Sequence, residues 1–181
     1  MRENIMDYSC RMTSKLLRKF LFAACLALAA PVFAQSVPAY NVTDMWWNPA
    51  ESGWGIAMQH STSTNQVYAL WHTFDSSDRE PSTSASGDFK PIWIAMTGGT
   101  WTSPTTLTGD AYVSNATAYW MPFVPGSFQI TRVGRFTFNF TSSTQATFTF
   151  EFTPPTNVAS NDPAFGFPSL AGTKNIQRYA F

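Results

Sequence analysis

The sequence has little that could serve redox or metal chemistry, with two cysteines and two histidines in 181 residues. Both cysteines, Cys10 and Cys25, lie before residue 35, so the rest of the chain has no thiol for a disulfide or a metal site. The strand register expected below separates His60 from His72 by about five residues, roughly 16 Å, which excludes a shared metal ion. We interpret both histidines as half-buried strand residues and expect no metal or other cofactor.

Charged residues are also scarce, at 12% of the chain, and no cluster of lysine and arginine follows residue 34. A nucleic-acid-binding surface needs such a cluster, so we expect no nucleic-acid partner. The Gly-x-Ser-x-Gly elbow of serine hydrolases and the glycine-rich loop that binds phosphate are both missing. The sequence therefore gives no support to a serine nucleophile or to nucleotide chemistry.

Long apolar runs are missing except for one near the N-terminus. Lys15, Arg18 and Lys19 precede the apolar run 20–30, and Val32-Phe33-Ala34 follows it, before Gln35. This order is typical of a secretory signal peptide, and the run is about half as long as a membrane-spanning helix requires. We expect residues 1–34 to be a signal peptide, residues 35–181 to be a single domain, and the protein to be secreted or periplasmic.

Aromatic residues, by contrast, are abundant: 16 Phe, 7 Trp and 6 Tyr. Apolar and polar residues alternate with a period of two, and no segment after residue 34 has the apolar spacing of a helix. The alternation predicts strands at about 54–61, 66–74, 91–97, 106–113, 136–140, 148–152 and 173–181. The expected fold is an all-β antiparallel meander, either a β-barrel or a closely related sandwich of about 7–8 strands.

Two hairpins are predicted with their register. A turn centred between Ser63 and Thr64 joins 54–61 to 66–74, and both faces of the second strand are expected to be covered. In the other hairpin, pairing positions 136 with 152, 138 with 150 and 140 with 148 stacks six phenylalanines on one face, which we interpret as core. The polar stretch 75–90 is interpreted as a mobile loop.

Strand direction sorts the connections into two groups. If consecutive strands are antiparallel neighbours, the short turns at 62–65, 98–105 and 141–146 share one end of the sheet. The long connections at 48–53, 75–90, 115–131 and 153–172 share the other. Loops on a rigid β scaffold usually carry the binding site, so we expect the site at the long-loop end.

Tryptophans are most concentrated in the stretch 46–55, Trp-Trp-Asn-Pro-Ala-Glu-Ser-Gly-Trp-Gly, where three of them surround a turn with one carboxylate. Flat aromatic rings bind sugar rings or apolar ligands, and Trp120 is the tryptophan expected to be most exposed. The hairpin register is expected to bring Glu51 close to Asp75. The candidate ligand-binding residues are Trp47, Asn48, Glu51, Trp54, Asp75, Trp93 and Trp120. No catalytic residue is assigned.

Four motifs are distributed over the chain: the stretch 46–55, Trp71-x-Thr73-Phe74-Asp75, Pro91-Ile92-Trp93 and Lys174-x-Ile176-x-Arg178. Together they resemble a family of uncharacterised secreted bacterial β proteins. The resemblance implies export and a shared β domain, but it brings no activity and no assigned site residues. The expected topology alone is also similar to avidin- and lipocalin-type meander barrels.

These features favour a binding or interaction module for carbohydrate or cell-envelope glycan, with a small apolar ligand as the second ligand class. One alternative is a glycoside-type hydrolase that uses Glu51 and Asp75 as paired carboxylates. The simpler interpretation of both is that they accept hydrogen bonds from backbone N–H groups in their turns. Another alternative is a structural component of the envelope or matrix that self-associates through Phe-rich edges. The oligomeric state is left open.

Overall fold

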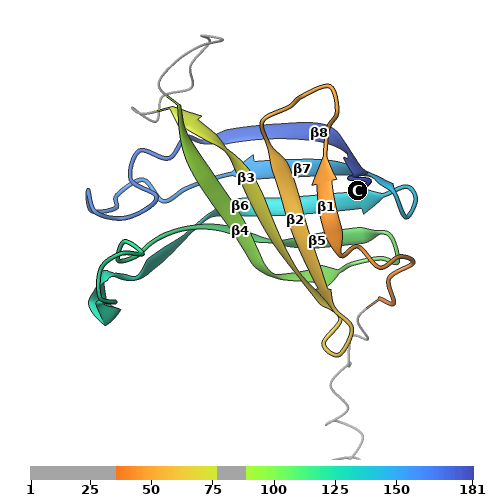
Figure 1. Cartoon of the computed structure of the whole chain (residues 1–181), viewed down its shortest axis with the longest axis horizontal. Coiled ribbons are helices and arrows are strands. Elements are labelled where there is room, and N and C mark those ends of the chain that lie inside the picture. Colours follow the sequence, from red (N-terminus) through yellow and green to blue (C-terminus); the bar gives the residue numbers. More distant parts are fainter. Residues whose placement is uncertain (1–35, 77–88) are drawn as a thin grey trace, which may run out of the picture. The chain divides into compact units, whose positions relative to one another are not determined.

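The computed structural model describes residues 36–76 and 89–181. Eight antiparallel strands form a closed barrel, in which each strand pairs with the next and the last pairs with the first (Figure 1). The strands are β1 (Asp44–Trp47), β2 (Gly55–Ser61), β3 (Gln66–Ser76), β4 (Phe89–Trp101), β5 (Thr106–Asn115), β6 (Gln129–Phe140), β7 (Gln145–Phe152) and β8 (Leu170–Arg178). The predicted all-β meander is confirmed, and it closes as a barrel rather than a sandwich.

No α-helix occurs in the described ranges, where the one helical element is the 3-10 turn η1 (Pro125–Ser127). Accordingly, these ranges contain no helix with the length and apolar character needed to cross a membrane. The predicted signal peptide lies outside the described residues, as does most of the predicted loop 75–90. The two ends of that loop, Asp75 and Lys90, belong to β3 and β4 and pair with each other.

The core lies inside the barrel and consists largely of aromatic rings. Phe136, Phe138 and Phe148 are fully buried, as the predicted Phe face requires. Trp71 of β3 reaches into this cluster and lies 5.0 Å from Phe148 and 4.9 Å from Phe150 between ring centroids. The barrel is therefore filled by side chains across its middle and does not enclose a wide ligand chamber.

The predicted register of the Phe-rich hairpin was wrong by two residues. Phe136 pairs with Phe150, Phe138 pairs with Phe148, and Phe140 pairs with Ala146. The reason is a tighter turn, because the Gln145 carbonyl accepts the backbone N–H groups of residues 141 and 142. A shift of two residues leaves every side chain on the same face, so the core assignment of the rings still holds.

The β2–β3 hairpin has the predicted register, with Gly55 opposite His72 and His60 opposite Val67. The expected cover on both faces of β3 was wrong, because Tyr68 and Phe74 on its outer face are exposed. Each strand of a closed barrel turns only one face toward the core. The expectation that both histidines are half-buried was also wrong. His60 points into the barrel and is buried, whereas His72 is on the outer face and is exposed.

Several strands differ in extent from their sequence-based predictions. β4 continues through 98–101, where a turn was predicted, and Thr100 and Trp101 pair with Thr108 and Leu107 of β5. A register shift between Met96 and Thr100 lets the strand continue through Gly98 and Gly99. The four-residue β1 was not predicted as a strand.

Candidate functional site

The junction that closes the barrel is short, since β1 and β8 share two residue pairs, Trp46 with Arg178 and Trp47 with Gln177. β8 brings two cations to this junction, Lys174 and Arg178, on either side of the buried Ile176. Alternation along the strand places both cations on the same face as Ile176, the inner face. Each cation meets a carboxylate and a tryptophan from the N-terminal part of the domain.

The first group of contacts, here called the Glu51 cluster, consists of Asn48, Glu51, Trp54 and Lys174. Glu51 Oε1 accepts a hydrogen bond from Asn48 Nδ2 at 2.9 Å, and Oε2 accepts one from Trp54 Nε1 at 3.2 Å. Lys174 Nζ forms an ion pair with Oε2 and lies 4.9 Å from the centroid of the Trp54 ring. The cluster therefore ties the β1–β2 turn to β8.

The turn that carries this cluster is built by local hydrogen bonds. The backbone N–H of Glu51 donates to the Asn48 carbonyl at 3.0 Å, and that of Ala50 donates to Asn48 Oδ1 at 3.0 Å. Gly53 has a φ of 104°, a conformation that a residue with a Cβ adopts only at a cost. Asn48 is thus fixed at both ends of its amide, by Glu51 and by the turn.

The second group, the Asp44 cluster, consists of Asp44, Trp46 and Arg178. Arg178 Nη1 lies 3.2 Å from Asp44 Oδ2, and the guanidinium carbon lies 5.2 Å from the centroid of the Trp46 ring. The same guanidinium donates to the carbonyl oxygens of Asn41 at 2.6 Å and Ser143 at 2.9 Å. Two motifs noted in the sequence, 46–55 and Lys174-x-Ile176-x-Arg178, therefore meet across the barrel closure.

The electrostatics of the Glu51 cluster favour an ionised carboxylate. The hydrogen bond from Lys174 is the largest cause that lowers the pKa of Glu51, and the hydrogen bonds from Trp54 and Asn48 act in the same direction. A general acid in glycoside hydrolysis needs a raised pKa instead. Glu51 is held by side-chain donors, rather than by the backbone N–H groups suggested from the sequence, and it acts here as a fixed acceptor.

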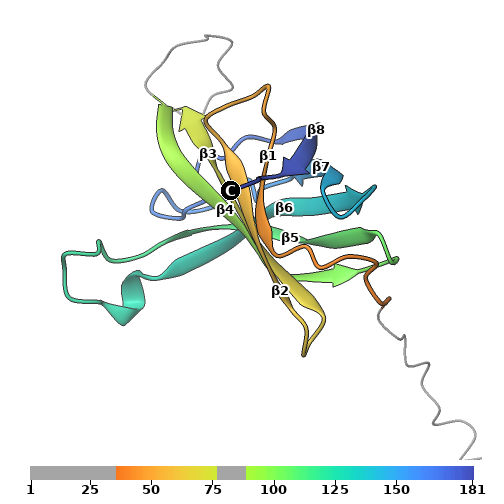
Figure 2. The same cartoon turned by 45° about the vertical axis from the view of Figure 1, so that its right-hand side comes forward.

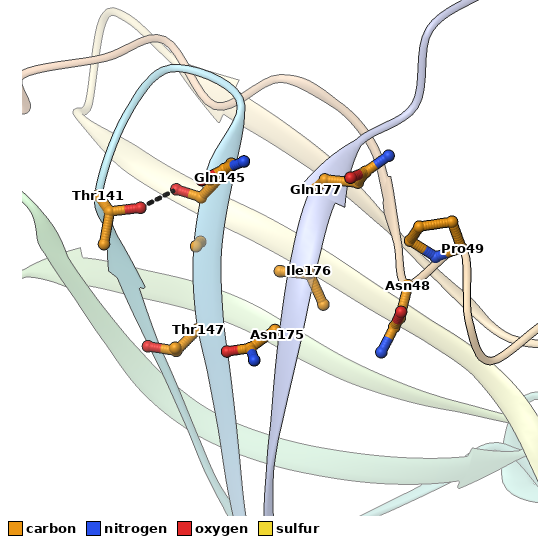
Figure 3. A pocket seen from close by; sticks show the side chains of 9 residues that line it. Asn48, Pro49, Thr141, Gln145, Thr147, Asn175, Ile176 and Gln177 are labelled. Carbon is orange, nitrogen blue, oxygen red and sulfur yellow. Dashed lines mark hydrogen bonds between the residues drawn. The ribbon is translucent and has the colours of Figure 1, made fainter.

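An uncharged groove lies beside this turn, on the outer wall of β7 and β8 (Figure 3). Its volume is about 370 Å³, within the usual range for small-molecule sites. Gln145 pairs with Gln177 across the two strands, and Thr147 pairs with Asn175. The lining residues of this β7–β8 groove are Asn48, Pro49, Thr141, Gln145, Ala146, Thr147, Asn175, Ile176 and Gln177.

An aromatic pair lies next to the groove. Trp47 is paired with the groove residue Gln177 and follows the buried Trp46, so its side chain points outward. Its ring centroid lies 5.3 Å from that of Tyr179, which is exposed. Polar amides and hydroxyls thus border an aromatic surface, and among the residues that the structure describes no charged side chain lines the groove.

The other predicted site residues lie elsewhere on the barrel. Asp75 lines a recess of about 230 Å³ with Trp71, Phe152 and Phe167. Trp93 is exposed and lines a recess of about 530 Å³ with residues of β5 and of the loop 160–163. Trp120 is in the β5–β6 loop and is exposed, as expected. The seven residues are therefore spread over several places, and Asn48 is the one that lines the β7–β8 groove.

Sequence reasoning missed the polar residues that form most of the groove, namely Thr141, Gln145, Thr147, Asn175 and Gln177. The alternation of Asn175 and Gln177 was visible, but their neighbours on β7 are about thirty residues earlier. Only the correct pairing of two distant strands brings these amides together. No group of three or more His, Cys, Asp or Glu that could hold a metal ion occurs in residues 36–76 and 89–181.

Comparison with protein-family models, with curated proteins and with solved structures found no match. The resemblance to a secreted bacterial β family therefore stays a prediction.

Proposed function

We propose that this chain is a secreted or periplasmic binding module that holds a neutral glycan in the β7–β8 groove. The observation that carries the proposal is the lining: four amide side chains and two threonine hydroxyls in an uncharged depression. Each amide offers both a donor and an acceptor, which matches the alternating roles of sugar hydroxyl groups. The predicted signal peptide supports export.

The aromatic pair at the edge of the groove supports the same ligand class. Sugar rings have an apolar face, and an exposed aromatic ring provides a flat surface for it. Tyr179 offers such a surface because it is exposed, and the Trp47 ring contacts it at 5.3 Å between ring centroids. A ligand that hydrogen-bonds Asn175 and Gln177 could extend one ring onto Tyr179.

The Glu51 cluster contributes by holding one groove residue in place. Glu51 and the turn backbone fix the two ends of the Asn48 amide, so this side chain loses little freedom when a ligand binds. Glu51 is then a positioning residue. The absence of charge in the lining favours a neutral glycan over an acidic one, which would leave its carboxylates without a cation.

The second ligand class, a small apolar molecule inside the barrel, has weaker support. The recess at Asp75 and Trp71 measures about 230 Å³, below the roughly 300 Å³ at which small-molecule sites usually begin. The middle of the barrel below it is filled by Trp71 and the phenylalanines. The surface groove is therefore the better site.

The test is a calorimetric titration of the protein with neutral oligosaccharides of glucose, galactose and N-acetylglucosamine, and with peptidoglycan fragments. Replacing Asn175 and Gln177 together by alanine should weaken binding about tenfold or more, since two hydrogen bonds of about 1 kcal/mol each are lost. The matched control is Gln59→Ala, which removes an exposed amide from the outer face of β2. The proposal fails if no glycan binds saturably, or if the control weakens binding as much as the groove variant.

A further inference from the structure

The loop between β5 and β6 exposes an unusual amount of apolar surface. Residues 116–128, here called the apolar loop, extend outward at the left of Figure 2. The exposed fractions are 95% for Tyr119, 73% for Trp120 and 67% for Phe123, and the side chains of Met121 and Val124 are also more than half exposed. Such a concentration of aromatic rings on a solvent-exposed surface marks an interaction site.

Internal hydrogen bonds hold the loop in this form. Thr117 Oγ1 lies 2.6 Å from Ser127 Oγ and accepts the backbone N–H of Val124 at 3.0 Å. Ser127 Oγ in turn donates to the Val124 carbonyl at 2.8 Å. Polar groups therefore face each other across the base of the loop, and Pro122 and Pro125 restrict its backbone. These hydrogen-bonded polar groups fill the base of the loop, so the apolar side chains stay on its outer surface.

The stem of the loop is also fixed to the barrel. Asn115 Nδ2 donates to the Asn161 carbonyl at 2.9 Å, and Thr131 Oγ1 donates to Asp162 Oδ1 at 2.8 Å. The stem thus contacts the β7–β8 connection on both of its strands. The loop tip is therefore a preorganised surface for a ligand.

The apolar loop itself carries no charged residue. Residues 111–131 contain no Asp, Glu, Lys, Arg or His. Asp110 and Arg132, which flank this segment in the chain, form an ion pair with each other at 3.0 Å. Asp162 meets the segment at its end, where Thr131 donates to it. A protein partner would ordinarily need charged or polar groups at the rim to fix its orientation, and an anionic lipid surface would need cations.

We propose that the apolar loop inserts into the interface of a zwitterionic lipid bilayer and attaches the barrel to it reversibly. Tyrosine and tryptophan prefer the headgroup level, where an apolar ring and a polar N–H or O–H are both accommodated, and Phe123 with Met121 can reach the acyl boundary. Insertion is shallow, because a loop can expose few backbone groups to hydrocarbon, and Met121 N–H is satisfied by the Ala118 carbonyl at 2.9 Å. This inference is independent of the glycan site.

The experiment is co-sedimentation with phosphatidylcholine vesicles. The protein should begin at residue 35, because the apolar run 20–30 would bind lipid by itself. Replacing Trp120 and Phe123 together by alanine should weaken vesicle binding about tenfold or more, as expected when two inserted rings are lost. Adding salt or anionic lipid should change little. Vesicles with brominated acyl chains should quench part of the tryptophan fluorescence of the wild type, and less of it in Trp120→Phe.

The matched control is Tyr68→Ala, which removes an exposed ring on the outer face of β3 near the β2–β3 turn and should leave vesicle binding unchanged. Equal thermal midpoints for wild type and variants are expected, since the replaced rings are exposed. No sedimentation with vesicles would overturn the proposal, as would equal loss of binding in Tyr68→Ala. Self-association without lipid that disappears in the double variant would also overturn it, because the loop would then be an interface between copies of the chain.

Discussion

Replacing Glu51 by glutamine tests whether the Glu51 cluster closes the barrel. The variant keeps the size of the side chain and one acceptor oxygen but loses the charge that pairs with Lys174. The Glu51 side chain is 41% exposed, so the ion pair is screened by solvent and contributes about 0.2–1 kcal/mol. One of the two donors, Asn48 or Trp54, also loses its carboxylate partner, at about 1 kcal/mol.

These losses sum to about 1–2 kcal/mol, which lowers the thermal midpoint by roughly 2–8 °C in a domain of this size. The assay is thermal unfolding followed by circular dichroism at pH 7, with Glu151→Gln as the control. Glu151 is an exposed carboxylate on β7, and its replacement should leave the midpoint within about 1–2 °C of wild type.

The difference in thermal midpoint between wild type and Glu51→Gln should depend on pH. The pKa of Glu51 is lowered in the folded state, chiefly by Lys174, so its stabilising effect is full above the pKa of the unfolded chain. The effect is lost as the pH falls through the lower, folded-state pKa, because the wild-type side chain then becomes neutral like glutamine. The thermal midpoints of wild type and Glu51→Gln should therefore begin to converge as the pH falls below the unfolded-state pKa of about 4.3, and they should meet only below the lower pKa of the folded state.

A double-mutant cycle with Lys174→Met completes the test. Because the two side chains share one ion pair, the double variant should lose less stability than the sum of the single variants. An unchanged midpoint for Glu51→Gln, or a loss with no pH dependence, would refute the reasoning. Loss of glycoside turnover with an unchanged midpoint would instead favour the hydrolase that the sequence left open.

Three further predictions concern the barrel wall and use the same unfolding assay. Phe148→Ala should cost about 3–5 kcal/mol, because this fully buried ring contacts the aromatic core, whereas the exposed Phe165 should tolerate alanine with little loss; similar midpoints would contradict the core assignment. Gly134→Ala should destabilise strongly, since a Cβ there overlaps a carbonyl oxygen of β7, while a Cβ at Gly126 meets no atom of the described residues within 4 Å, so Gly126→Ala should be neutral. Asp110→Asn should cost less than about 1 kcal/mol and the cost should fall with salt, because its two arginine partners are exposed; a loss above about 2 kcal/mol would contradict this.

The fold class followed from the sequence because alternation is a local signal, clearest where Phe and Thr alternate along β6 and β7. The β2–β3 register followed too, since the turn is short and ends at Asn65, a residue type that accepts its φ of 55°. The β6–β7 register did not, because Thr141 to Thr144 contain no glycine, proline or asparagine to mark the turn. A shift of two residues also preserves the hydrophobic pattern, so nothing in the alternation could correct it.

The candidate site was harder to predict because its residues meet through the closure of the barrel. The sequence suggested that neighbours in the chain, such as Trp47 and Glu51, belong to one site. Lys174 reaches Glu51 only because β8 returns to β1, and β8 contributes Asn175 to the groove for the same reason. Long-range pairing of this kind leaves no local signal, so the sequence identified Asn48 but none of the groove residues on β7 and β8.

The concentration of tryptophans around one carboxylate in the stretch 46–55 has a structural explanation. β1 is four residues long and shares two residue pairs with β8, so backbone hydrogen bonds alone give a weak closure. The Glu51 and Asp44 clusters add an ion pair and a cation–π contact on each side of Ile176. The inner-face positions of β8 thus stabilise the barrel, whereas the outer-face positions Asn175 and Gln177 are free to bind a ligand.

Asn48 belongs to both systems, because it donates to Glu51 and lines the groove. A change at Glu51 should therefore weaken glycan binding without touching the ligand, by releasing the Asn48 amide. A change at Asp44, which pairs with Arg178 and does not line the groove, should lower stability and leave the affinity of the folded protein unchanged. Comparing affinities of the two variants well below their unfolding temperatures separates the closure of the barrel from the positioning of the groove.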